Sequence, residues 1–97
     1  MERTTYLVTY DICEPKRLRA VYVTCRSYGD HLQYSVFRCE LSPLQKARLI
    51  SELDDILNKH EDQVLIIALG NNDNEVNRRF ESVGRPYERK TTGAKIV

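Results

Sequence analysis

The sequence alternates between strand-like and helix-like segments, and the order of these segments restricts the possible folds more than any other feature. Residues 4–12 are rich in Thr, Tyr, Leu and Val, which suit a pleated strand. Residues 15–28 carry apolar residues at the spacing of one helix face. Residues 31–41 are again strand-like, residues 42–60 are helix-like, and the apolar run QVLIIAL occupies residues 63–69.

Residues 31–41 allow two interpretations, one long strand or two short strands bent near Tyr34 and Ser35. We favour two strands, because they complete the order β-α-β-β-α-β. The prediction is therefore an α+β, ferredoxin-like βαββαβ sandwich, with a four-stranded antiparallel sheet and two helices on one face. Within it, we expect QVLIIAL to be a central strand buried on both faces.

Both helices have recognisable first turns and apolar faces. Pro15 stands near the start of the first helix and Gly29 at its end. Ser42 is the expected N-cap of the second helix, followed by Pro43 and by Gln45 at the capping-box position. The apolar face of the first helix is Leu18, Val21, Tyr22, Cys25 and Tyr28. The apolar stripe of the second helix is Ala47, Ile50, Leu53 and Leu57, widened by Leu49 and Ile56.

A chain of 97 residues is long enough for one domain. We expect the domain to span residues 1–84, with a short third helix over residues 75–82, and residues 85–97 to form a tail. Helices on one face leave the other face of the sheet uncovered, so we expect a homodimer packed sheet to sheet. The apolar residues 94–97 would add a short C-terminal strand to a sheet edge, in the same chain or across the dimer.

Composition argues against membrane and disulfide-rich classes of protein. No apolar run approaches the ~20 residues of a membrane-spanning helix, and no signal peptide precedes the first strand. We therefore expect a cytoplasmic protein with no membrane contact. Cys13, Cys25 and Cys39 form no close pair, which argues against a disulfide framework or a Cys-x-x-Cys zinc site. We expect all three to be small buried hydrophobic residues.

The charges are sorted along the chain although the net charge is only +1. Residues 42–75 hold three Lys or Arg and seven Asp or Glu, whereas residues 76–97 hold six and two. Residues 16–29 hold four basic residues and no acidic residue. Basic patches that suit a nucleic acid can therefore coexist with a nearly neutral total.

Asp11 is the most unusual candidate for a functional residue, because it is a carboxylate near the end of the apolar strand YLVTYDI. In a structural role it would cap the turn toward Pro15. In a functional role it needs a second copy, because one carboxylate binds Mg²⁺ weakly and a two-fold axis beside the strand would bring two together. A bridging Mg²⁺ would relieve the repulsion between them and activate a water toward a phosphodiester. The residues alone leave both roles open.

The first helix carries a basic stripe away from its apolar face, formed by Lys16, Arg19 and Arg26. Such a stripe is commonly a solvated helix face. It also suits contact with a nucleic-acid backbone, and the absence of acidic residues on this helix favours that function.

Aromatic residues and histidines offer weaker signals. Tyr10, Tyr34 and Phe37 suit either base stacking or burial in the sheet, and we expect burial. His31 and His60 stand alone, as ordinary surface or helix-end residues do. The sequence has no Gly-rich phosphate loop, no Gly-x-Ser-x-Gly and no His-Glu-x-x-His.

Four segments together resemble the CRISPR-associated Cas-two family. They are VTYDI at residues 8–12, KRLR at residues 16–19, GDHLQYSVF at residues 29–37 and LSP at residues 41–43. The segments follow the order and spacing of that family, and the resemblance covers residues 4–70.

The resemblance implies a ferredoxin-like homodimer in the adaptation module of CRISPR immunity. Members bridge two dimers of a partner integrase and help to capture new spacer DNA. Some are endonucleases on RNA or double-stranded DNA that use Mg²⁺, with Mn²⁺ as a substitute, and the strand-end aspartate is their catalytic metal ligand, here Asp11. In other members this aspartate is dispensable for spacer acquisition. A metal-dependent nuclease and a non-catalytic DNA-binding scaffold both remain open, and a toxin-type ribonuclease of the virulence-associated-protein-D kind is a more distant alternative.

The resemblance also adds candidate residues to the basic stripe. It brings in Arg17, and it places His31 where the family commonly has arginine, so that phosphate contact there would be weaker and pH-dependent. The expected nucleic-acid-binding residues are therefore Lys16, Arg17, Arg19, Arg26 and His31, and the expected supporting residues are Tyr10, Ser35 and Phe37.

Overall fold

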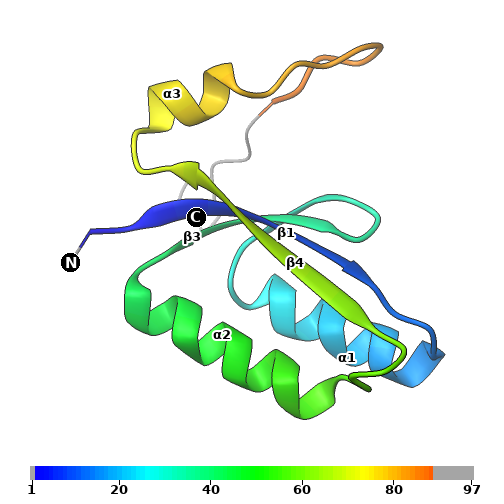
Figure 1. The fold of residues 1–97 in the computed structure, drawn as a ribbon. Coiled ribbons are helices and arrows are strands. Elements are labelled where there is room, and N and C mark those ends of the chain that lie inside the picture. Colours follow the sequence, from blue (N-terminus) through cyan, green and yellow to red (C-terminus); the bar gives the residue numbers. More distant parts are fainter. Residues whose placement is uncertain (1, 89–97) are drawn as a thin grey trace, which may run out of the picture.

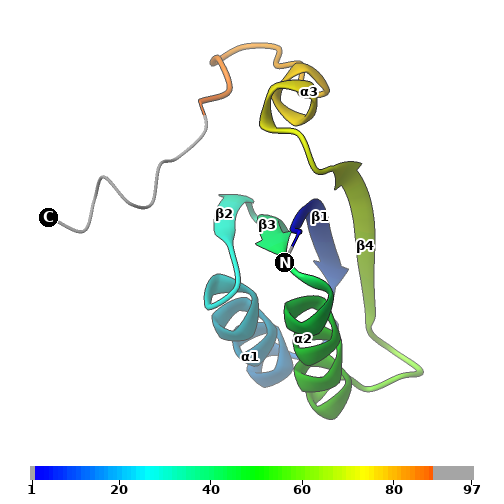
Figure 2. The ribbon, with the colours of Figure 1, turned by 90° about the vertical axis from the view of Figure 1, so that its left-hand side faces the viewer.

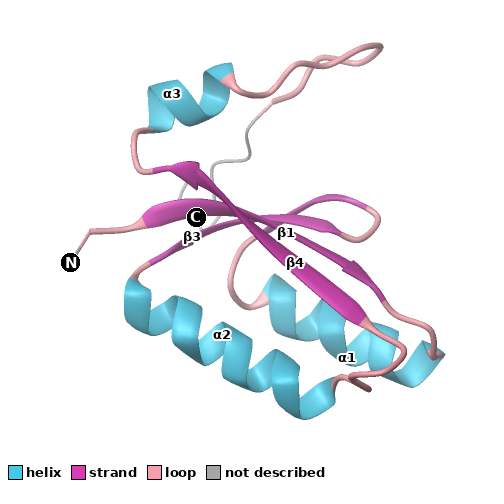
Figure 3. Cartoon of the chain, viewed as in Figure 1, coloured by secondary structure: helices cyan, strands magenta, loops and turns pink. Residues whose placement is uncertain are grey.

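The computed structural model describes residues 2–88 and confirms the expected order of strands and helices (Figure 1, Figure 3). Residues 31–41 contribute two strands, as predicted, and the third helix is shorter than predicted. The elements are β1 (Thr4–Asp11), α1 (Pro15–Arg26), β2 (Asp30–Gln33), β3 (Val36–Leu41), α2 (Pro43–Ile56), β4 (Gln63–Gly70) and α3 (Asp73–Arg78).

The four strands form one antiparallel sheet in the order β2-β3-β1-β4. Helices α1 and α2 pack against the same face of this sheet, as the α+β ferredoxin-like fold requires (Figure 1, Figure 2). The expectation that QVLIIAL is a central strand was wrong, because within residues 2–88 β4 pairs only with β1 and lies at an edge. Its apolar residues divide between two faces: Val64 and Ile66 pack against the core, whereas Leu65 and Ile67 are 48% and 44% exposed.

The core lies between the sheet and the two helices. Val8 and Phe37 from the sheet and Val21 from α1 are fully buried there. Helix α2 turns a slightly different face inward than predicted. Leu49 and Leu53 are buried, while Ala47 is exposed and Ile50 is 45% exposed. Adjacent residues lie about 100° apart on a helix, so apolar spacing alone did not separate Leu49 from Ile50.

The predicted signals at the helix starts are confirmed. The Ser42 hydroxyl accepts a hydrogen bond from the Gln45 amide at 3.2 Å, and the Ser42 amide donates to Gln45 Oε1 at 2.8 Å, which completes the capping box. Helix α1 ends before the expected stop at Gly29, with Ser27 as its C-cap, and Gly29 has a steric role instead. A Cβ atom at this position would lie 2.4 Å from the Arg38 carbonyl oxygen, so a side chain would collide with β3.

We call the sheet face that points away from α1 and α2 the free face. Successive side chains of a strand alternate between faces, and Val8 and Tyr10 are buried in the core. Thr9 and Asp11 of β1 therefore point to the free face. The paired strands place Arg38 of β3 and Leu65 and Ile67 of β4 on the same face.

The expectation that this whole face is uncovered was wrong at one end. Helix α3 lies on this side of the sheet (Figure 1, Figure 2). Arg38 Nη1 donates to Asn77 Oδ1 at 3.0 Å and to the Tyr87 hydroxyl at 2.9 Å, and its guanidinium lies 5.4 Å from the Phe80 ring centroid. These contacts hold residues 77–87 over the Arg38 end of the free face. The predicted strand at residues 94–97 lies outside the described residues.

Two of the three cysteines are buried, as predicted. Burial raises the pKa of the Cys25 thiol to about 11 and that of the Cys39 thiol to about 12. The prediction was wrong for Cys13, which is exposed in the loop between β1 and α1. No helix in residues 2–88 is long and apolar enough to cross a membrane.

Candidate nucleic-acid and metal site

Asp11 is the last residue of β1 and is exposed. It lies opposite Gln63, the first residue of β4, and its side chain projects from the free face. In its structural role Asp11 would cap the turn toward Pro15, but Glu14 Oε1 accepts the Arg17 amide at 2.8 Å and serves as the N-cap of α1. Asp11 is therefore not the N-cap of this helix.

Within residues 2–88, one copy of the chain places no cluster of further metal ligands around Asp11. Among residues 2–88, no group of three or more His, Cys, Asp or Glu side chains is placed to hold a metal ion. Mg²⁺ is commonly held by one or two carboxylates with several waters. A second Asp11 from another copy would fit that chemistry, whereas one Asp11 alone is a weak ligand.

The basic stripe of α1 is exposed as expected. Lys16, Arg19 and Arg26 are all exposed, and the only hydrogen bond of this stripe within residues 2–88 joins Arg26 Nη1 to the Tyr22 hydroxyl at 3.0 Å. However, α1 packs on the core face of the sheet (Figure 1). The alternation of side chains along β1 places Asp11 on the free face. The structure therefore does not place the stripe and Asp11 on one continuous face.

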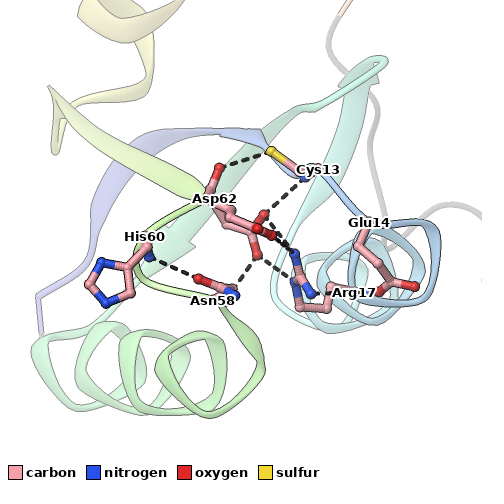
Figure 4. Close-up of polar contacts among 7 residues, drawn as sticks. Cys13, Glu14, Arg17, Asn58, His60 and Asp62 are labelled. Carbon is pink, nitrogen blue, oxygen red and sulfur yellow. Dashed lines mark hydrogen bonds and ion pairs between the residues drawn. The ribbon is translucent and has the colours of Figure 1, made fainter.

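Arg17 has different partners from the phosphates expected for it. Its Nε lies 2.7 Å from Asp62 Oδ2, and its Nη2 lies 2.9 Å from Glu61 Oε1 (Figure 4). These carboxylates raise the pKa of Arg17 further, chiefly through the hydrogen bond with Asp62. Arg17 thus joins α1 to the segment before β4, and its charge is already balanced.

Asp62 is the centre of this cluster, which the sequence analysis did not identify. Its side chain is fully buried and accepts the amide of Cys13 at 2.9 Å and that of Asn58 at 3.0 Å, in addition to Arg17 (Figure 4). The hydrogen bond from Arg17, followed by those from the two amides, lowers the pKa of Asp62 to about 2. An acidic residue between a helix and a strand normally indicates a solvated loop, so the burial of Asp62 could not be inferred from its place in the sequence.

The expected supporting residues Tyr10 and Phe37 lie on the core face of the sheet, opposite to the face of the Asp11 side chain. Phe37 is buried and Tyr10 nearly so, as expected, and their rings stack with centroids 6.2 Å apart. Burial is the main cause of the raised pKa of the Tyr10 hydroxyl. The Tyr10 amide donates to the Ser35 carbonyl oxygen at 3.1 Å, which attaches the end of β1 to the β2–β3 turn.

His31 packs into the aromatic core of the hairpin. Its ring lies 5.3 Å from the Tyr22 ring and 4.9 Å from the Phe37 ring, centroid to centroid. Its Nε2 lies 2.6 Å from the Tyr34 carbonyl oxygen, which can only accept, so Nε2 is the donor. This nitrogen is occupied by the protein and not directed at a phosphate.

Tyr34 is the exposed aromatic residue that we expected to be buried. It is 93% exposed at the tip of the β2–β3 hairpin, and its φ of 30° lies in the left-handed region that non-glycine residues rarely adopt. The tight turn between the two strands explains the conformation. The ring is free to stack on a base, as the open alternative in the sequence analysis allowed.

Comparison with known proteins agrees with this fold. The family model of CRISPR associated protein Cas2 matches residues 4–76. A CRISPR-associated endoribonuclease Cas2 of Rhodospirillum rubrum is 36% identical over 92 residues, covering 95% of this chain and 89% of that protein. A CRISPR-associated endonuclease Cas2 of Halalkalibacterium halodurans is 38% identical over 71 residues, covering 68% of this chain and 74% of that protein.

A solved structure has the same fold. The crystal structure of Streptococcus pyogenes Cas2 superposes with a TM-score of 0.73 and 34% sequence identity, covering 82% of this chain and 99% of that chain. The family model spans β1 through β4 and reaches into α3, so it contains Asp11, the basic stripe and Asp62. The chain therefore belongs to the family of CRISPR associated protein Cas2.

Proposed function

We propose that two copies of this chain form a homodimer through the free face and hydrolyse phosphodiesters at a pair of Asp11 carboxylates. The observation that carries this proposal is that Asp11 is exposed on the same face as Leu65 and Ile67, which are 48% and 44% exposed. Exposed apolar residues on a sheet face favour association with another surface. A two-fold axis close to the end of β1 would make the two Asp11 residues neighbours.

The metal in this proposal is Mg²⁺, with Mn²⁺ as a substitute. Such a cation, when bound, lowers the pKa of a coordinated water and offsets the charge of the phosphate. The contribution of this chain is to present the two Asp11 carboxylates in fixed positions. The bond from the Tyr10 amide to Ser35 and the pairing of Asp11 with Gln63 supply that rigidity.

The nucleic acid in this proposal is RNA or double-stranded DNA bound through its phosphates. The exposed Lys16, Arg19 and Arg26 support backbone contact, and contacts of this kind carry little sequence information. The relative named endoribonuclease supports RNA as a substrate, and the relative named endonuclease supports cleavage of a nucleic acid without specifying its kind.

In the cell, the proposed role is CRISPR adaptation in the cytoplasm, in which the dimer bridges two dimers of a partner integrase during spacer integration. Membership of the Cas2 family supports this role over that of a toxin-type ribonuclease. A spacer-acquisition assay tests it directly. Deleting this chain should abolish acquisition of new spacers, and unchanged acquisition without the chain would contradict the role.

A non-catalytic scaffold is the second candidate function. It is favoured by the finding that one chain, within residues 2–88, supplies Asp11 without a neighbouring cluster of ligands. The same assay separates the two functions when the Asp11→Asn variant is included. Full spacer acquisition by this variant, with hydrolysis lost, would mean that the scaffold is the cellular function.

A further inference from the structure

The Asp62 carboxylate holds together two segments that flank Asp11. On one side, the Cys13 amide, two residues after Asp11, donates to Asp62 Oδ1 at 2.9 Å. On the other side, Asp62 directly precedes Gln63, which pairs with Asp11 across the β1–β4 ladder. The chain just after Asp11 and the strand opposite it are therefore joined through one buried side chain, and Figure 4 shows the bond from Cys13 to Asp62.

The contacts of Asp62 use both of its oxygens and leave little freedom to the loop. Oδ2 accepts from Arg17 Nε at 2.7 Å and from the Asn58 amide at 3.0 Å, while Oδ1 accepts from Cys13 and lies 3.4 Å from Arg17 Nη2. A second bond closes the same loop, because the Cys13 thiol donates to the Glu61 carbonyl oxygen at 3.0 Å. An ionised carboxylate suits this position, because it accepts at both oxygens and balances the Arg17 charge.

We propose that Asp62 is a positioning residue that fixes the Asp11 carboxylate for the cation held between two copies, an inference that rests on the proposed function. Mg²⁺ demands nearly ideal geometry from its ligands, and a small displacement of a reacting group lowers rates strongly. Two carboxylates across an axis also repel each other, so each needs support from its own chain. Asp62 supplies that support without contacting the cation or the substrate.

The test compares Asp62→Asn with the matched control Asp54→Asn. Asp62→Asn keeps the shape of the side chain but replaces one accepting oxygen with an NH₂ group. This donor would face the N–H groups that now donate to Asp62, so it cannot form their hydrogen bonds. Asp54 forms an exposed ion pair with Lys59 at 3.3 Å, so its substitution removes an equal charge and leaves the Asp62 cluster intact. Circular dichroism and sedimentation check that both variants fold and associate as wild type does.

Cys13 provides a readout that does not depend on activity. It is the exposed cysteine, whereas burial protects Cys25 and Cys39, so a thiol reagent reports mainly on Cys13. We expect Asp62→Asn to raise the labelling rate of Cys13 several-fold, because the loop loses a bond at its amide. We expect Asp54→Asn to leave that rate unchanged.

Manganese binding and hydrolysis supply the second and third readouts. Loss of a residue that orients a metal ligand typically lowers metal affinity or activity by about 10- to 100-fold. We expect Asp62→Asn to weaken Mn²⁺ binding and to lower kcat within this range, while KM for the nucleic acid stays within about twofold, since the basic stripe is untouched. Asp54→Asn should match wild type in all three measurements.

The outcomes separate this inference from the proposed function. If Asp62→Asn raises the labelling rate of Cys13 but leaves Mn²⁺ affinity and kcat unchanged, Asp62 has only a structural role and the inference is overturned. An unchanged labelling rate of Cys13 in Asp62→Asn would overturn it as well. Wild-type Mn²⁺ binding by Asp11→Asn would instead overturn the metal site itself, and the inference with it. If Asp62→Asn does not fold, Arg17→Lys loosens the same cluster, because lysine cannot reproduce the contacts of Arg17 Nε and Nη2 with Asp62 and Glu61. Cys13 labelling, Mn²⁺ binding and hydrolysis are then measured on that variant.

Discussion

Asp11 and Gln63 face each other at the end of the β1–β4 ladder, so the exposed carboxylate stands on the free face beside the outer edge of the sheet. Leu65 lies two residues further along β4 and points to the same face. This relationship connects association and chemistry, because a surface that buries Leu65 in a dimer also brings the Asp11 end of β1 toward the partner.

The proposed dimer is tested by placing a charge on this surface. Leu65→Asp should leave the protein monomeric at micromolar concentration where the wild type is dimeric, because burying an unpaired carboxylate is unfavourable. Analytical ultracentrifugation measures the change. Leu44→Asp is the control, because Leu44 is 55% exposed on α2 and lies away from the free face. Equal dissociation of both variants, or of neither, would argue against this interface.

The basic stripe is tested by the double variant Arg19→Ala and Arg26→Ala. Binding of duplex DNA or RNA should weaken, and the slope of log affinity against log salt should flatten by about one unit for each lost phosphate contact. The variant Lys59→Ala, which removes a charge already paired with Asp54, should bind as wild type does. If the double variant keeps the wild-type slope, the stripe is only a solvated helix face.

The Asp62 cluster predicts a specific acid dependence of stability. The pKa of Asp62 in the folded chain is about 2, below its ordinary value of 3.8. A lowered carboxyl pKa stabilises the fold above the ordinary value, and this stabilisation is lost as the pH falls toward about 2. The difference in urea midpoint between wild type and Asp62→Asn should therefore be full at about pH 6 and shrink below about pH 4. A difference that stays constant down to about pH 2.5 would contradict this assignment.

Arg38 predicts an unusual response to substitution. Its side chain is 3% exposed, and its Nε and Nη2 are buried without a hydrogen-bond partner in the described chain. Replacing a poorly compensated buried charge with an apolar side chain is often neutral or stabilising. The free energy of unfolding of Arg38→Met should therefore lie within about 1 kcal/mol of the wild-type value. Arg38→Ala should lose about 2 kcal/mol, because it also removes packing under Phe80. Chemical denaturation measures both, and a loss in Arg38→Met as large as that in Arg38→Ala would contradict this prediction.

The sequence predicted the features that depend on neighbouring residues. The capping box of Ser42 and Gln45 follows from local chemistry. The turn at Tyr34 and Ser35 was instead predicted from the order of elements, because two strands there complete the βαββαβ pattern. The edge position of β4 was not predictable in the same way. A continuous apolar run is expected for a strand at the centre of a sheet, but an edge strand whose outer face packs against another surface has the same composition.

The candidate site was predictable only in part. Asp11 stands out because a charged residue interrupts an apolar strand. Asp62 does not, because its burial depends on Arg17 and Cys13, which lie 45 and 49 residues earlier in the chain. The assignment of Arg17 to nucleic acid followed from the family resemblance, and only the fold reveals that two carboxylates balance its charge.

The rate of metal-dependent phosphodiester hydrolysis by purified Asp11→Asn tests the central claim most directly. The substitution removes the charge of both proposed ligands at nearly constant shape, so hydrolysis in Mg²⁺ or Mn²⁺ should fall by about 100-fold or more, while duplex binding persists and the dimer in chelator is at least as stable as wild type. Hydrolysis by Asp11→Asn at the wild-type rate under the same metal conditions would contradict the claim.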